Sequence, residues 1–441
     1  MKKYQWPGGY NVLQSLVRTY KQVKNPIGTM EESMARFGGT YSVNLGRLRL
    51  IATQDPAFIE YVLKTNHRNY NKSVILTEQL GRFLGKGLLT SNGEFWLRQR
   101  RLIQPGFHVS KLHALYSIMK RTIDEFIPEI PEGKAVDVYP FMNKLAFQIV
   151  INTLFNVKIE DEKRNALSSF ISDTQDFVIK DVRQPYNSWW FRLSGEVDRD
   201  LKRAEGAREI IRSMIRQRKE SGERMDDLLD MLLDARYEDN GEPMHEEQMI
   251  DEILVLLIAG HETTANALSF ALYLLADHPD ELIKLRATTV TLDIDKIVKS
   301  RELAAVINET MRLYPPAWIA DRVSLHDDAF DNYTFPKDTI IVLFYYGLHR
   351  NEKYWENPLE FRPDRFLNEI IEKDKPKAFF PFGSGPRLCI GNNFAMAEMA
   401  IFLQAFITQF DLTPTGRVPQ IKPLVTLRPE KVYLGITRKK A

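Results

Sequence analysis

The sequence predicts a mainly α-helical fold with minor β-sheets, of the α+β class. Most of the chain has apolar residues at helical spacing, for example over 111–129, 142–155, 198–219 and 282–313. One stretch, 247–277, is apolar on every face in its middle, which a surface helix would not tolerate. Short alternating segments add a few strands. We therefore expect a long helix to run through the centre of a helical protein.

Three segments are expected to form the strands. Residues 40–53, TYSVNLGRLRLIAT, alternate, are rich in β-branched residues and contain an Asn-Leu-Gly turn, which predicts a hairpin. Residues 337–346, KDTIIVLFYY, predict a second strand pair, and the tail from 419 to 437 predicts strands that close the fold.

Composition limits the domain organisation and the class of protein. The 441 residues contain no Pro/Gly/Ser-rich linker, so one domain over 1–441 is expected. A single cysteine excludes an internal disulfide and multi-cysteine zinc or iron–sulfur sites, and it fits a reducing compartment. Residues 1–25 hold no apolar run long enough for a signal peptide or membrane span. A cytoplasmic, soluble protein is expected, and a net charge of +2 gives no argument for nucleic acid.

Polar residues interrupt the apolar central helix at AGHETT, residues 259–264. A zinc-protease HExxH motif is excluded because Ala265 stands where the second histidine must be. A threonine that bonds back to a helix carbonyl can open a turn beside Gly260 and hold water near Glu262 and Thr263. An acid and an alcohol beside water suit proton delivery. A solvated stripe on one helix face is the alternative.

A second motif, ETMR, places Glu309 and Arg312 on one side of a helix that two prolines then end. Farther on, FRPDRF (361–366) supplies Arg362 and Arg365 in a non-helical stretch. Either arginine could join Glu309 in a buried cluster, and an ordinary surface ion pair is the alternative.

The only cysteine, Cys389, lies in FGSGPRLCIG (382–391). This loop lacks a phosphate-loop lysine and a Gly-x-Ser-x-Gly, which excludes those two functions. A helix is predicted directly after the cysteine, and unpaired N–H groups at its start would lower the pKa of the thiol. The thiolate would be a nucleophile or a metal ligand. No histidine lies close in sequence to serve as its base, and a buried structural cysteine remains an alternative.

The cysteine loop resembles the haem-binding signature F-x-x-G-x-R-x-C-x-G of the cytochrome P450 family. Every fixed position is matched, by Phe382, Gly385, Arg387, Cys389 and Gly391.

Four further motifs occur in the family's order. AGHETT resembles the oxygen-activation motif, and Glu309 with Arg312 matches E-x-x-R. FRPDRF is similar to Pro-Glu-Arg-Phe with Asp364 in place of Glu, and WLRQR (96–100) resembles W-x-x-x-R. The resemblance spans nearly the whole chain and implies the family's fold, a triangular helical domain with a long central helix, here as one haem domain.

The resemblance implies haem b, iron protoporphyrin IX, as the cofactor. The Cys389 thiolate would be the axial ligand of the iron, and the glycines would let the loop approach the porphyrin. Ala259 and Gly260 would lie over the porphyrin face. The two propionates would be neutralised by Trp96, Arg100, Arg322 and Arg387.

The remaining motif residues would act in catalysis or hold the scaffold. Glu262 and Thr263 would deliver protons during oxygen activation. Glu309, Arg312 and Arg365 would lock the structure behind the haem.

The implied activity is a monooxygenase that inserts one oxygen atom from O2 into an organic substrate. The residues after Cys389 are too few for a flavin domain, so no fused reductase or ferredoxin is expected. Electrons from NAD(P)H would come through a ferredoxin and its reductase, or a flavodoxin-type donor. The electron donor would dock on basic residues of this chain: Arg98, Arg101, Lys111, Lys375 and Lys377. The alternative is that these residues are ordinary solvated surface charges.

The family position of two segments suggests an apolar substrate pocket lined by Leu89, Ala317, Trp318 and Ile319. Hydroxylation of a fatty acid, terpenoid or steroid is therefore favoured. In PYNSWW (185–190) the tryptophans could cover a lipid, stack on a sugar, or simply pack between helices. Oxidative O-demethylation of a small oxygenated compound stays an alternative, as does a haem sensor or a haem-thiolate isomerase.

Overall fold

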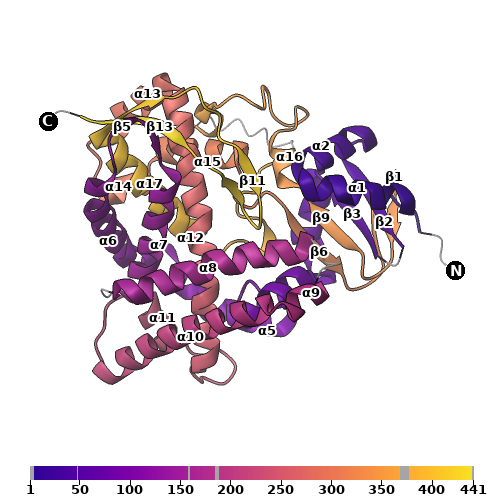
Figure 1. Cartoon of the computed structure of the whole chain (residues 1–441), viewed down its shortest axis with the longest axis horizontal. Helices are drawn as coiled ribbons and strands as arrows, with labels where there is room; N and C mark the ends of the chain where they lie inside the picture. Colours follow the sequence, from indigo (N-terminus) through magenta and orange to yellow (C-terminus); the bar gives the residue numbers. More distant parts are fainter. Residues whose placement is uncertain (1–3, 47, 157–158, 184–187, 368–376, 440–441) are drawn as a thin grey trace. The chain divides into compact units, whose positions relative to one another are not determined.

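The structure is a computed structural model that describes residues 4–46, 48–156, 159–183, 188–367 and 377–439. The described residues form two compact units, each built from separate stretches of the chain. Among the described residues, the sheet unit comprises those up to 73, 311–362 and 377–389, and the helical unit comprises those within 74–310, 363–367 and 390–439. Helices predominate and the sheets are small, which confirms the predicted class (Figure 1). The single domain over 1–441 stays a prediction.

The sheet unit contains a six-stranded sheet of order β1-β2-β3-β9-β6-β4. Its predicted hairpin is confirmed, since Thr40 pairs with Thr53 and Leu45 with Leu48 in antiparallel register. The strands are β1 (Gly9–Tyr10), β2 (Thr40–Leu45), β3 (Leu48–Thr53), β4 (Tyr70–Asn71), β6 (Ala320–Ser324) and β9 (Ile340–Leu343). A separate hairpin joins β7 (Asp328–Phe330) and β8 (Tyr333–Phe335).

The strand pair predicted over 337–346 is only half present. Strand β9 forms and runs parallel to β3, but the chain then enters helix α16 (Tyr345–His349). All residues of α16 are buried. The apolar run at 337–346 therefore indicates burial. Buried strands and buried helices both contain such runs, so the run cannot by itself tell a strand from a helix.

The sheet unit also contains helices, among them three in its N-terminal part. They are α1 (Val12–Lys24), α2 (Pro26–Phe37) and α3 (Pro56–Glu60). A buried core joins residues of β3, α3, β8 and β9 with Phe380, and it includes Ile51, Phe58, Phe335 and Ile341. Phe380 brings the start of the cysteine loop into this core, so the loop is anchored at its N-terminal end.

The helical unit carries most of the helices. They are α4 (Gly81–Leu84), α5 (Gly93–Ile103), α6 (Val109–Phe126), α7 (Tyr139–Phe155), α8 (Asp161–Arg183), α9 (Ser188–Leu193), α10 (Glu196–Ser221), α11 (Leu228–Asp234), α12 (Glu246–Asp277), α13 (Pro279–Thr289), α14 (Ile294–Ile297) and α17 (Asn392–Gln409). Helix α15 (Arg301–Leu313) ends with three residues that belong to the sheet unit. The continuous helical pattern predicted over 282–313 is therefore three helices. Two N-caps divide this segment. The Asp293 carboxylate accepts a hydrogen bond from the Lys296 N–H, and the Ser300 hydroxyl accepts one from the Leu303 N–H.

Helix α12 runs the length of the helical unit (Figure 1). It matches the predicted central helix to within one residue and packs on α7. In the described part of the chain it alone is long and apolar enough to cross a membrane, but 78% of its apolar window is buried in the protein. That burial is typical of a core helix.

A three-stranded sheet of order β10-β13-β5 completes the helical unit. It consists of β5 (Gly133–Asp137), β10 (Phe410–Pro414) and β13 (Tyr433–Arg438), and β11 (Ile421–Pro423) pairs with β12 (Leu427–Pro429). The predicted strands in the tail are confirmed.

Candidate functional site

The sequence-predicted site residues divide between the two units. The sheet unit holds Cys389 with Phe382, Gly385, Arg387 and Arg322. The helical unit holds the residues of α5 and α12 and also Gly391, which directly precedes α17.

The cysteine loop is closed by its own backbone. The Cys389 N–H donates to the Phe382 carbonyl at 3.0 Å, and the Leu388 N–H donates to the Gly385 carbonyl at 3.0 Å. Phe382 is half-buried, whereas the Cys389 side chain is exposed. The loop therefore presents its thiol outward on a backbone that is already ordered, as a ligand for a bound metal would require, and exposure excludes the buried structural cysteine.

Gly385 is the residue on which this loop depends. Its φ is +69°, which favours glycine, and a Cβ at this position would lie 2.1 Å from the Leu63 carbonyl oxygen. Gly383 also has a positive φ, +74°, but faces open space. Gly385 thus allows the loop to pass directly against the backbone at Leu63.

Two arginines place positive charge in the same unit. Arg387 donates to the Asn71 amide oxygen at 3.3 Å, and Arg322 donates to the Asp321 carbonyl. Burial and the nearby charge of Arg322 lower the pKa of Arg387 to about 10. A ligand with negative charge would offset the effect of burial and of Arg322 on the charged form of Arg387. The two propionates of haem fit this pair, and an exposed thiol in the same unit fits its iron.

In the helical unit, one narrow strip is accessible in the middle of α12, between residues 252 and 272. Ala259 is exposed, and Leu256, Gly260 and Thr263 are half-buried, at the spacing of one helix face. The Thr263 hydroxyl donates to the Ala259 carbonyl at 2.7 Å, and the helix is continuous, so the expected opened turn is not observed. Ala259 and Gly260 carry little or no side chain, so a flat ligand could approach the helix closely at these two residues.

Glu262 faces away from this strip and is 3% exposed. It accepts a hydrogen bond from the Thr426 hydroxyl at 2.7 Å, and the Arg428 guanidinium lies 3.8 Å away. Burial raises the pKa of Glu262, while Thr426 and Arg428 partly oppose the shift. Glu262 and Thr263 are therefore neighbours whose polar atoms have different partners.

The other polar residues of AGHETT are buried, which excludes a solvated polar face. His261 contacts Asn143 at 3.1 Å and lies edge-to-face with Phe147. Burial lowers the pKa of His261 to about 4, so it is neutral at physiological pH and contributes to packing. Thr264 donates to the Gly260 carbonyl.

Glu309 and Arg365 meet within the helical unit. Arg365 Nε lies 3.3 Å from Glu309 Oε1, and Glu309 is fully buried, which excludes the surface-pair alternative. In the sheet unit, Arg312 is also fully buried and donates to three backbone carbonyls, of His349, Pro358 and Glu360, at 2.7–3.1 Å.

The remaining candidate haem contacts lie on α5 and before α17. Trp96 is 7% exposed, and Arg100 is half-buried and donates to Gln104 at 3.0 Å. The Gly391 carbonyl accepts from the Ala395 N–H, in the first turn of α17.

The candidate pocket residues differ in exposure. Leu89 and Ile319 are half-buried and Ala317 is exposed. Trp318 is 5% exposed and lies edge-to-face with Phe344, so its ring belongs to the core of the sheet unit.

Trp189 and Trp190 are 62% and 53% exposed and contact each other edge-to-face at 5.9 Å. This exposure excludes packing between helices for both rings. The first three residues of the aromatic segment, 185–187, lie outside the described residues.

The sequence patterns did not identify Glu398 as a candidate site residue. It lies fully buried on α17, and burial raises its pKa to about 8, while Thr264 partly opposes the shift. A lone acid in the apolar run NNFAMAEMAIFL was the available signal, but it does not identify the neighbour on α12. Arg428, beside Glu262, carried no signal at all.

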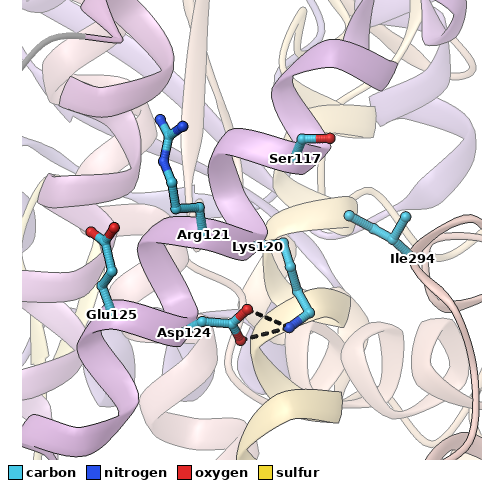
Figure 2. Close-up of a pocket in the computed structure, with 6 residues that line it drawn as sticks. All are labelled: Ser117, Lys120, Arg121, Asp124, Glu125 and Ile294. Carbon is cyan, nitrogen blue, oxygen red and sulfur yellow. Dashed lines mark hydrogen bonds and ion pairs between the residues drawn. The ribbon is translucent and has the colours of Figure 1, made fainter.

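A surface hollow of about 560 Å³ on α6 is separate from all these residues (Figure 2). Lys120 donates to both oxygens of Asp124 there, and Arg121 reaches Asn156 instead. Most of its lining side chains are exposed, so the hollow is a charged surface rather than a buried ligand site.

Comparison with known proteins gives the same family throughout. A sequence model described as cytochrome P450 matches residues 7–436. Cyclooctat-9-en-7-ol 5-monooxygenase of Streptomyces melanosporofaciens is 30% identical over 87% of this chain and 84% of its own length. Echinocystic acid 23-monooxygenase of Saponaria officinalis is 29% identical over 91% and 82%.

Among solved structures, the cytochrome P450DA heme domain aligns with a TM-score of 0.88, at 23% identity, over 100% of this chain and 99% of that one. That likeness supports the fold. Because the family's sequence model covers nearly all residues, the chain belongs to the cytochrome P450 family.

Proposed function

We propose that this cytochrome P450 monooxygenase hydroxylates a hydrophobic compound such as a terpenoid, fatty acid or steroid. The observation that carries the proposal is the exposed thiol of Cys389 on an ordered loop, in the same unit as the cations Arg322 and Arg387. Haem b held there would supply the oxidant that inserts one atom of O2 into a C–H bond, with electrons from NAD(P)H.

The chain's own groups would bind and orient that cofactor. The Cys389 sulfur would hold the iron, on a loop positioned by Phe382 and Gly385 in the sheet unit and by Gly391 in the helical unit. The propionates would be bound by Arg322 and Arg387 and, from α5, by Trp96 and Arg100. Ala259 and Gly260 would present a flat helix surface.

Protons would be moved by Thr263 and Glu262. The Thr263 hydroxyl lies on the accessible strip of α12 and now donates to Ala259. Rotation of its side chain would free that proton for transfer. Burial raises the pKa of Glu262, so its carboxyl would hold a proton more readily than an exposed one. The hydrogen bond from the Thr426 hydroxyl would keep this carboxyl in place, and a water would carry the proton from it.

The structural residues would keep the site rigid. Glu309 with Arg365 in one unit, and Arg312 in the other, satisfy buried charges and carbonyls and would hold the segments that carry the catalytic residues.

The substrate class is supported by apolar candidates for the pocket, Leu89, Ala317 and Ile319. The names of the two relatives describe oxidation of cyclooctat-9-en-7-ol and of echinocystic acid, which agrees with a lipophilic substrate.

Electrons would come from a separate ferredoxin with its reductase, or a flavodoxin-type donor, in the cytoplasm. Arg101 and Lys111 are exposed and Lys377 is exposed in the other unit, whereas Arg98 already pairs with Asp239. Lys375 lies outside the described residues.

Thr263→Ala tests the proton-delivery role. The variant should keep its haem while product formed per NAD(P)H falls by roughly tenfold or more, because general acid catalysis is lost. The electrons that no longer form product should appear as hydrogen peroxide, so hydrogen peroxide is measured together with product and NAD(P)H. Thr263→Ser keeps the hydroxyl and should retain most of the yield. Equal yields in the alanine variant and the wild type would contradict the role.

A further inference from the structure

Helix α1 exposes its apolar side to solvent. Its apolar residues fall within about 140° of the helix circumference at 3.6 residues per turn. The exposed fractions are high for large apolar side chains: Val12 41%, Leu13 74%, Leu16 58%, Val17 62% and Tyr20 65%. These five residues are the α1 stripe. An exposed patch of this kind on one helix marks an interaction surface.

Two polar residues of α1, Ser15 and Arg18, face the protein instead. Ser15 is 1% exposed, and its hydroxyl accepts from the Asn44 N–H at 3.2 Å. Arg18 donates to the Thr29 carbonyl at 3.0 Å and to both oxygens of Glu32. These bonds orient the helix, so the α1 stripe cannot turn inward without breaking them.

Positive charge borders the α1 stripe. Lys21 and Lys24 are exposed at its edge, and Lys24 Nζ lies 4.6 Å from the centre of the Tyr20 ring. Residues 1–30 contain five Lys/Arg and no Asp/Glu. The nearest acids by sequence lie on α2, and Glu32 is paired with Arg18.

From this arrangement we propose that α1 docks on an anionic lipid bilayer, parallel to its surface. The α1 stripe would enter the boundary between headgroups and acyl chains, and Lys21 and Lys24 would contact lipid phosphates. Docking is a peripheral contact that is independent of the haem chemistry.

A second copy of the chain fits less well. A face about 20 Å long and roughly 10 Å wide offers on the order of 200 Å², well below the ~800 Å² per partner of a stable interface. A bilayer needs no such complementary area.

The test is co-sedimentation of the haem-loaded full chain with vesicles. Vesicles of phosphatidylcholine with phosphatidylglycerol are compared with pure phosphatidylcholine, at low and high salt. We expect binding to the anionic vesicles that weakens with salt, and little binding to the neutral ones. No binding to either vesicle, or equal binding to both, would overturn the proposal.

Matched variants locate the contact. Leu13→Gln/Leu16→Gln should weaken binding by roughly tenfold or more, and Lys21→Gln/Lys24→Gln should remove the preference for anionic lipid. Ile283→Gln, equally exposed at 61% on α13, should change nothing. Haem absorbance and circular dichroism verify that each variant is folded. Stripe variants that bind normally would overturn the proposal. A dimer in sedimentation that the stripe variant abolishes, without vesicle binding, would assign the stripe to a second copy instead.

Discussion

Arg312→Met is expected to destabilise the sheet unit by about 3–5 kcal/mol. Arg312 is fully buried, and three backbone carbonyls accept hydrogen bonds from its guanidinium. The ring of Trp355 also lies 5.1 Å from it. Methionine fills much of the volume but donates nothing, so all three carbonyls become unsatisfied in a dry environment.

Urea unfolding of the haem-loaded protein, followed by circular dichroism and haem absorbance, measures this loss. Arg312→Lys is the matched control, since it keeps the charge and loses the planar fork, and it should recover only part of the stability. A methionine variant with an unchanged unfolding midpoint would show that these hydrogen bonds contribute little.

Gly385→Ala is expected to disrupt the cysteine loop. The added Cβ would lie 2.1 Å from the Leu63 carbonyl oxygen, in a backbone conformation with φ of +69°. Strain of roughly 1–2 kcal/mol from the left-handed conformation adds to roughly 1–3 kcal/mol from overpacking. The loop must move to relieve this clash, and the thiol of Cys389 moves with it.

Gly383→Ala separates the two contributions. Gly383 has a similar φ, +74°, but no atom lies within 4 Å of its added Cβ. Gly383→Ala should therefore lose only the stability that the backbone strain costs, and it should still bind haem. Haem content per protein and thermal unfolding of both variants are the measurements, and equal behaviour of the two would exclude the contact with Leu63 as the cause.

The sequence predicted helices and strands correctly where the apolar residues of a segment follow one regular spacing, either helical or alternating. Helix α12 and the hairpin of β2 and β3 were predicted almost to the residue, because each has an uninterrupted pattern. The division of 282–313 into three helices depends on caps at Asp293 and Ser300, which periodicity overlooks. At 337–346 the run is apolar because α16 is buried, so tertiary packing decided its conformation.

Site residues were predictable where the chemistry is local. The glycines around Cys389 and the pairing of Glu309 with a later arginine could be inferred from sequence. Glu398 and Arg428 could not, because their significance comes from neighbours far along the chain, Thr264 and Glu262. Sequence spacing also put Glu262 and Thr263 together, whereas the helix directs their side chains to different partners.

The most direct test of Cys389 as the haem ligand is the carbon monoxide difference spectrum of the reduced protein, recorded beside Cys389→Ser. The wild type should show the red-shifted band characteristic of thiolate ligation, and the serine variant should lose it. A wild type that binds no haem, or a band that survives in Cys389→Ser, would contradict the assignment of Cys389 and the mechanism that depends on it.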